Sequence, residues 1–102
     1  MKLDLKLSYR KLAGDSDTKP EDITRMLIVN SVQNKFPQTM DRDASRIWAK
    51  IMDRLLNDTE IDLDATEFEW LKDKIDNSQH AAMFSSYLWT LREHLDNKAK
   101  QS

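Results

Sequence analysis

The sequence predicts a mainly α-helical fold with a minor β component, in which an N-terminal strand precedes about four helices around a single core. Three observations lead to this class. Apolar residues recur at steps of three and four over most of the chain, which is typical of helices that bury one face. Residues 3–10 instead alternate apolar and polar side chains, as a half-buried strand does. One glycine and two prolines are too few for the many tight turns of an all-β sandwich or barrel.

Length and composition predict one soluble domain. A chain of 102 residues has the usual size of a single domain. The absence of cysteine excludes disulfides, zinc–thiolate sites and thiol nucleophiles. The longest apolar run is far shorter than a membrane span, and the N-terminus lacks the apolar core of a signal peptide. We therefore expect a cytoplasmic protein without membrane contact, divided into a strand and turn (1–17), a helical part (18–97) and a frayed tail (98–102).

The N-terminal strand bears on the oligomeric state. A polar turn over residues 13–17 follows this strand, whose apolar face carries Leu3, Leu5, Leu7 and Tyr9. A strand without a neighbour leaves backbone N–H and C=O groups unpaired, and such edges invite pairing with another chain. Within this chain the only candidate mate is the segment 59–63. We expect a homodimer through the strand or the tryptophans, and internal pairing with 59–63 if the chain is monomeric.

The first two helices are predicted from about residue 18 to 36 and from 41 to 56. Thr18 and Glu21 have the spacing of a capping box, and Pro20 suits the first helical turn. Phe36 ends the first helix, because the residue before a proline resists helical backbone angles. The second helix has one continuous apolar face, which consists of Ala44, Ile47, Trp48, Ile51, Met52 and Leu55.

The third helix has the clearest start signal in the chain. Asp64 has the position of an N-cap, and Glu67 follows three residues later, as in a capping box. Leu63 and Phe68 have the spacing of the matching hydrophobic staple. The segment 59–63 before this start alternates apolar and acidic residues and predicts a short extended piece.

The third helix is predicted to end near Asp76-Asn77, and the fourth to follow residues 78–80. The fourth helix is expected to fray from Asn97 onward. Its core-facing side chains are Ala81, Phe84, Tyr87, Leu88, Leu91 and Leu95.

The sequence contains no clear constellation for catalysis. His80 and His94 are fourteen residues apart, about 20 Å along a helix, which is too far to share a metal or a proton. Gly14 is the only glycine, so phosphate loops and nucleophile elbows are absent. The acidic stretch 58–69 resembles a calcium loop, but Leu63 stands where that loop needs glycine. We expect no enzyme, no cofactor and no metal site.

The second helix carries a row of cations at steps of four residues. Arg42, Arg46, Lys50 and Arg54 form a ridge roughly 18 Å long. Like charges at this spacing slightly destabilise a helix, so helix stability alone does not favour them. The ridge is interpreted as a solvated face, or as a surface for an acidic protein, for the chain's own acidic segment or for a phosphate backbone.

Charge is unevenly distributed along the chain. Residues 1–55 hold 11 basic and 8 acidic residues, a balance of +3, and residues 56–102 hold 5 and 10, a balance of −5. Such a bipolar chain can pair its halves internally or with a second copy. Nucleic-acid-binding domains are usually basic, whereas this chain has a net charge of −2. Nucleic-acid binding therefore remains an alternative only through the ridge of the second helix.

The tryptophans give a second indication of a contact surface. Trp48 and Phe68 fall on apolar helix faces and are predicted to be core residues. Trp70 and Trp89 lie off the apolar stripes of their helices. Both are interpreted either as buried by a second layer or as interface residues, since tryptophan is favoured at interfaces.

The order of these features resembles a group of small, largely uncharacterised proteins encoded by bacteriophages and prophages. The segments that carry the resemblance are Arg25–Asn30, Ala49–Met52, Glu60–Leu63 and Glu67–Lys72, within residues 20–95. The N-terminal region is shorter than in that group, because a second hairpin strand is not evident. The resemblance implies a viral accessory protein in the bacterial cytoplasm and transfers no catalytic residue.

These observations favour an accessory or regulatory protein that binds a host or viral protein without catalysis. The alternative is a nucleic-acid-binding regulator that uses the ridge of the second helix. The candidate partner-binding residues are Arg42, Arg46, Lys50, Arg54, Trp70 and Trp89.

Overall fold

The computed structural model describes residues 1–33 and 40–101 and confirms the mainly α-helical class. Four helices and a two-stranded sheet make up the described part of the chain. In chain order the elements are β1 (Lys2–Asp4), the 3-10 turn η1 (Ala13–Asp15), α1 (Pro20–Gln33), α2 (Arg42–Asn57), β2 (Glu60–Asp62), α3 (Ala65–Asp76), the 3-10 turn η2 (Ala82–Phe84) and α4 (Ser85–Lys100).

The N-terminal strand pairs within the chain with the segment 59–63, the candidate mate that the sequence indicates, so the strand is not left without a neighbour. β1 runs antiparallel to β2, with Leu3 opposite Ile61. The Leu5 N–H donates to the Thr59 carbonyl at 2.9 Å and extends the pairing by one residue. The regular strand is shorter than the predicted 3–10, because α2 ends just before Thr59 and leaves no further extended segment to pair with. The predicted alternation persists in burial: Leu3, Leu5 and Leu7 are buried.

The predicted starts of α2 and α3 are confirmed. The Asp41 carboxylate accepts the Ala44 N–H at 2.8 Å and caps α2. At α3, the Asp64 carboxylate accepts the Glu67 N–H at 2.7 Å, and the Glu67 carboxylate accepts the Asp64 N–H at 3.0 Å. This is a complete capping box. The staple residues Leu63 and Phe68 are both buried.

The boundaries of α1 and α4 differ from the prediction. α1 begins at Pro20, so Lys19 and not Thr18 precedes it, and the Lys19 carbonyl accepts the Ile23 N–H at 3.2 Å. The end predicted at Phe36-Pro37 lies outside the described residues. α4 begins at Ser85, later than predicted, because residues 82–84 wind into a 3-10 turn.

The C-terminal end of α4 also differs. The helix continues to Lys100, so the frayed tail predicted over 98–102 is wrong for residues 98–100. Ala99 packs partly buried against the core, and this contact gives the last helical turn a reason to form.

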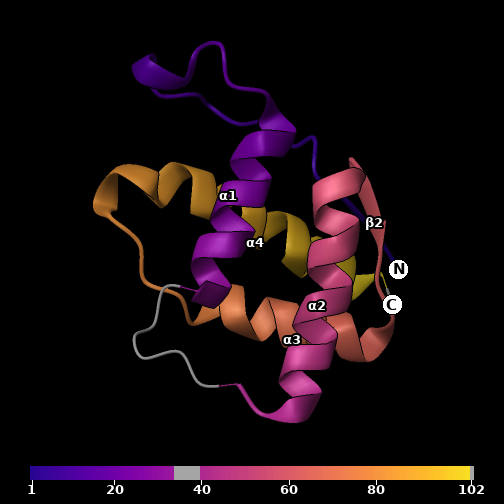
Figure 1. The fold of residues 1–102 in the computed structure, drawn as a ribbon. Coiled ribbons are helices and arrows are strands. Elements are labelled where there is room, and N and C mark those ends of the chain that lie inside the picture. The colour runs from indigo at the N-terminus through magenta and orange to yellow at the C-terminus, as the bar shows by residue number, and fades with distance from the viewer. Residues whose placement is uncertain (34–39, 102) are drawn as a thin grey trace.

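One core joins all the helices and both strands. In Figure 1, α4 passes behind α1, α3 lies below both, and α2 stands beside β2. β1 and β2 close the side of the molecule next to α2. Among the described residues, the fully buried apolar side chains include Leu3, Leu5, Leu27, Ile28, Ile51, Leu55, Leu71, Ile75, Leu91 and Leu95. In the described part, no helix has both the length and the apolar composition that crossing a bilayer requires.

Candidate functional site

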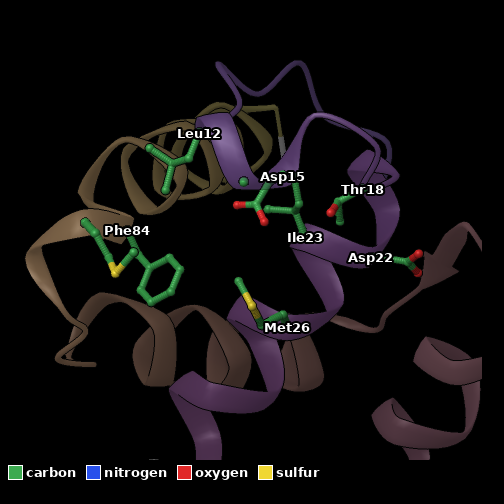
Figure 2. A pocket seen from close by; sticks show the side chains of 9 residues that line it. Leu12, Asp15, Thr18, Asp22, Ile23, Met26 and Phe84 are labelled. Carbon is green, nitrogen blue, oxygen red and sulfur yellow. The ribbon is translucent and has the colours of Figure 1, made fainter.

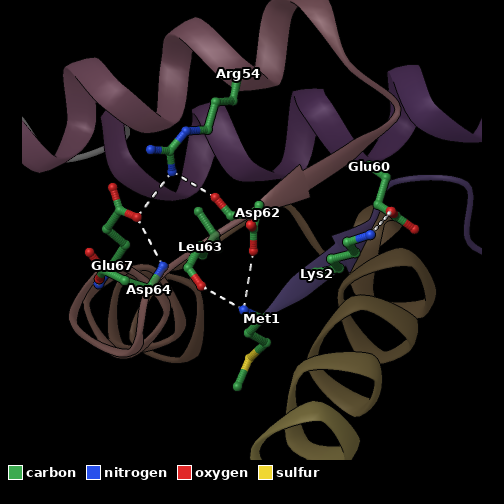
Figure 3. Close-up of polar contacts among 8 residues, drawn as sticks. All are labelled: Met1, Lys2, Arg54, Glu60, Asp62, Leu63, Asp64 and Glu67. Atoms are coloured by element: carbon green, nitrogen blue, oxygen red, sulfur yellow. Dashed lines mark hydrogen bonds and ion pairs between the residues drawn. The ribbon is translucent and has the colours of Figure 1, made fainter.

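The structure divides the four cations of α2 into one structural residue and three exposed ones. The Arg54 Nη1 atom donates to the Asp62 carbonyl at 2.7 Å and to the Glu67 carboxylate at 3.0 Å (Figure 3). The Glu67 side chain is only 7% exposed. Arg54 is therefore engaged with the chain's own acidic segment, which is one of the alternatives that the sequence left open for this row of cations.

The remaining three cations, which we call the cationic ridge, are Arg42, Arg46 and Lys50. All three are exposed. Arg46 lies 3.7 Å from Asp43, and both side chains are largely in solvent, so this ion pair contributes between about 0 and 1 kcal/mol. Within residues 1–33 and 40–101, neither Arg42 nor Lys50 has an ion-pair partner. The ridge is thus open to an anionic partner.

The two off-stripe tryptophans have different environments. Trp70 packs half-buried against the core, with its ring centroid 6.1 Å from that of Trp48. The Lys74 ammonium lies 5.4 Å from the Trp70 ring centroid, within the range of a cation–π contact. Trp70 is therefore covered by its own chain. Trp89 is 71% exposed and has the environment of an interface residue.

A hollow of about 520 Å³ lies beside Trp89. The Arg92 side chain on its wall is fixed at the end of α3: Nη2 donates to the Ile75 carbonyl at 2.9 Å and to the Ser78 carbonyl at 3.1 Å. The Ile75 carbonyl also accepts the Ser78 hydroxyl at 2.7 Å, so Arg92 and Ser78 meet at the C-terminal end of α3. The described residues that line the hollow are Ser78, Gln79, His80, Ser85, Leu88, Trp89 and Arg92.

A second, more apolar pocket of about 290 Å³ lies between η1, α1 and η2. Figure 2 shows the Met26 and Phe84 side chains reaching into it from two sides, with Leu12 above. Asp15 at its rim accepts the Tyr87 hydroxyl at 2.8 Å, and Leu12 donates its N–H to the same hydroxyl oxygen at 2.8 Å. These two hydrogen bonds of Tyr87 hold the loop that contains Leu12 and Asp15 against α4 beside the pocket. Sequence reasoning missed this pocket, because its walls come from segments about 60 residues apart.

In the described part of the chain, Ser31 and His80 form a hydrogen-bonded pair, but the pair lacks the arrangement of a nucleophile and its base. The Ser31 hydroxyl donates to the Leu27 carbonyl at 2.7 Å, so its single proton is already used. His80 Nε2, 3.2 Å from Ser31 Oγ, must then be the donor in that contact. Burial, with a further contribution from the Arg92 charge, lowers the pKa of His80. The pair ties the 78–80 loop to α1.

His94 has an unusual environment on the inner side of α4. Its Nε2 atom is buried and has no hydrogen-bond partner in the described part of the chain. Burial is the main cause that lowers the pKa of His94, the Lys98 charge lowers it further, and the Asp4 carboxylate acts in the opposite direction. The described residues bring together no three His, Asp or Glu side chains with the geometry to hold a metal ion.

Comparison with protein-family models, with curated proteins and with solved structures found no match to this chain. Sequence reasoning identified Trp89 and the ridge, but it missed Arg92. The available signal was the spacing of Trp89 and Arg92, three residues apart on one helix, which places both on one side.

Proposed function

We propose that this protein is an accessory or regulatory protein that acts by binding another protein through the exposed side of α4 around Trp89. The observation that carries the proposal is the exposure of the Trp89 indole. Tryptophan and arginine are the residue types most enriched at the centres of protein interfaces, and here Trp89 borders a hollow with Arg92 on its wall. The phage or prophage setting is part of this proposal and rests on the resemblance of the sequence layout.

The hollow supports this proposal in a second way. Leu88 forms an apolar part of its wall and the fixed Arg92 guanidinium a polar part. In a recess of this kind, the apolar wall buries a side chain of the partner, and the polar wall fixes the orientation of a polar group of that partner. Because the Arg92 side chain is already held by α3, little side-chain freedom remains to be lost on binding.

The experiment is a comparison of three immobilised proteins in a bacterial lysate. Trp89→Ala removes the indole, and Leu56→Ala is the matched control, since Leu56 is 65% exposed but lies on α2. We expect proteins retained by the wild type and by Leu56→Ala to be lost with Trp89→Ala. Retention of the same proteins by Trp89→Ala at equal amounts would contradict the proposal.

The cationic ridge supports nucleic-acid binding as a second candidate. Three exposed cations at steps of four residues are suited to contact phosphates, and such binding weakens steeply with salt. For the protein-binding function we expect no detectable affinity for mixed-sequence duplex DNA even at low salt. Micromolar binding that falls steeply with salt, and that Arg42→Ala together with Lys50→Ala abolishes, would instead establish the nucleic-acid regulator.

A further inference from the structure

We infer that the partner of the α4 surface is an acidic protein segment, which places a side-chain carboxylate on Arg92 and a nearby apolar side chain against Trp89. The inference rests on the proposed function, because it names the chemistry of the partner that binds the same surface. It depends on two features of the hollow beside Trp89. One is a guanidinium whose charge no acidic residue neutralises, and the other is an apolar wall directly next to it.

The Arg92 guanidinium is fixed in place but only partly used. Its Nη2 atom donates to the Ile75 and Ser78 carbonyls, and its Nε atom lies 3.3 Å from the Ile75 carbonyl. The N–H groups of Nη1 have no hydrogen-bond partner in the part of the chain that the structure describes. Arg92 therefore presents held, unused donors, and a carboxylate is an acceptor that a guanidinium binds strongly.

The charge of Arg92 is not neutralised by a nearby carboxylate. Neutral groups accept its hydrogen bonds, and no Asp or Glu among residues 1–33 and 40–101 forms an ion pair with it. Burial lowers the pKa of His80 on the same wall, the Arg92 charge lowers it further, and no carboxylate counteracts them there. The described residues that line the hollow include no acid, so the hollow attracts an anionic group.

The other charges of α4 are compatible with an acidic partner. The helix Ser85–Lys100 holds three basic and two acidic residues, a balance of +1. Of the two acids, Asp96 is paired with Lys72 at 3.0 Å. Glu93 follows Arg92 by one position, so it is turned about 100° away around the helix axis. An acidic segment in the hollow therefore meets the Arg92 charge, whereas a basic segment would be repelled by it.

The apolar wall stands at a suitable distance from the guanidinium. Trp89 and Arg92 are three residues apart on α4, which brings their Cβ atoms to about 5–6 Å, and Leu88 completes the apolar part of the wall. In an extended chain, side chains two residues apart lie on one side at about 6.5–7 Å. An extended segment that has an apolar residue two positions from Asp or Glu therefore reaches the indole and the guanidinium together.

The experiment compares peptides that differ in one charge. The probes are acetyl-Leu-Ala-Asp-amide and acetyl-Leu-Ala-Asn-amide, which have nearly the same shape, so that only the carboxylate distinguishes them. A third probe, acetyl-Ala-Ala-Leu with a free C-terminal carboxylate, tests a chain end as the source of the charge. Binding to the full chain is followed by NMR through the indole N–H of Trp89 and the Nε–H of Arg92, at peptide concentrations up to about 20 mM.

Substitutions locate the site on α4. Arg92→Gln removes the charge of the hollow, and Arg46→Gln is the matched control, because Arg46 is exposed on α2. Trp89→Ala removes the indole and keeps the charge. Circular dichroism and urea unfolding check that each variant is folded. The comparison of the Asp and Asn peptides on the wild type needs no substitution, so it decides the inference even if Arg92→Gln does not fold.

We expect the Asp peptide to bind the wild type and Arg46→Gln at least about 5-fold more tightly than the Asn peptide. Arg92→Gln should bring this ratio close to one, whereas Trp89→Ala should weaken both peptides and preserve the ratio. Equal affinities of the two peptides for the wild type, or a ratio that depends on Arg46, would overturn the inference. The absence of any shift at Trp89 and Arg92, or tighter binding of the peptide with the free C-terminus, would overturn it as well.

The proposed function fails or stands by a separate result. If the Asp and Asn peptides bind equally while lysate proteins are still lost with Trp89→Ala, the α4 surface binds a partner that is not acidic, and only this inference fails. If Trp89→Ala retains the same lysate proteins as the wild type, the proposed function fails, whatever the peptides do.

Discussion

Charged residues have different roles in two regions of the molecule. At the junction of β2 with α2 and α3 they pair with one another, whereas on the outer side of α4 they lie in solvent. At the junction, the Glu67 carboxylate accepts from Arg54 and from the Asp64 N–H, and the Asp64 carboxylate accepts the Glu67 N–H. Lys2 and Glu60 add an ion pair across the sheet at 3.8 Å, and the Met1 amino group donates to the Leu63 carbonyl at 3.0 Å (Figure 3). On the outer side of α4, Trp89 and Glu93 face solvent.

The difference shows what decides whether a charged residue is structural or available for binding. Arg54 belongs to the same row of cations as Arg46 and Lys50, and nothing in its own sequence position distinguishes it. It becomes structural because the buried Glu67 lies 3.0 Å away. A buried carboxylate needs its partners, whereas the exposed cations of the ridge are solvated and lose little when they exchange water for a partner.

The largest expected effect on stability is that of Glu67→Ala, at the junction of β2 with α2 and α3. The substitution leaves the Asp64 N–H without an acceptor and leaves the Arg54 guanidinium with the Asp62 carbonyl alone. Together these losses should cost about 2–3 kcal/mol. Urea unfolding should show this loss of stability. The control is Glu69→Ala, an exposed position on the same helix, which should change stability by less than about 0.5 kcal/mol. Equal effects of the two substitutions would mean that the hydrogen bonds of Glu67 at the junction do not stabilise the fold.

A smaller loss is expected from Asp64→Ala. It removes the N-cap acceptor of α3 and should destabilise the fold by about 1 kcal/mol. The Glu67 contact with Arg54 remains in this variant, so the effect should be smaller than that of Glu67→Ala. An unchanged midpoint in urea unfolding would show that the cap contributes nothing to α3.

The pH dependence of stability tests the environment of His94, whose buried Nε2 atom has no hydrogen-bond partner in the described part of the chain. Burial lowers the pKa of His94 in the folded state below the ordinary value of 6.5. Below pH 6.5 the unfolded chain therefore binds more protons than the folded chain, and the free energy of unfolding falls as pH decreases toward the folded pKa. We expect stability to be higher at pH 8 than at pH 5.5. His94→Gln should reduce this difference without abolishing it, because the pKa of His80 is also lowered. A pH profile identical to that of the wild type would contradict this role of His94.

The smallest expected effect on stability is that of Trp89→Ala. The indole is mostly in solvent, so its removal should change the free energy of unfolding by less than about 0.5 kcal/mol. If Trp89→Ala abolishes binding and leaves stability unchanged, the outer side of α4 serves binding, whereas Glu67 at the junction serves stability. A loss of stability near that of Glu67→Ala would show that the outer side of α4 is structural after all.

Features that depend on neighbours a few residues away could be predicted from the sequence. The caps at Asp41 and Asp64, and the capping box completed by Glu67, involve hydrogen bonds between residues three positions apart. The alternating burial of Leu3 and Leu5 follows from the geometry of any extended chain. Such patterns can be recognised without knowing what else the chain contacts.

Which of several equivalent residues are used inside the fold depends instead on how distant segments pack. Arg54 and Arg46 are alike in sequence, as are Trp70 and Trp89. Arg54 meets Glu67 from another helix, Trp70 meets Trp48, and the other two meet solvent. The same holds for β1, whose mate lies about 58 residues along the chain. These outcomes depend on the packing of distant segments, and local periodicity carries no information about which distant side chain arrives within contact distance.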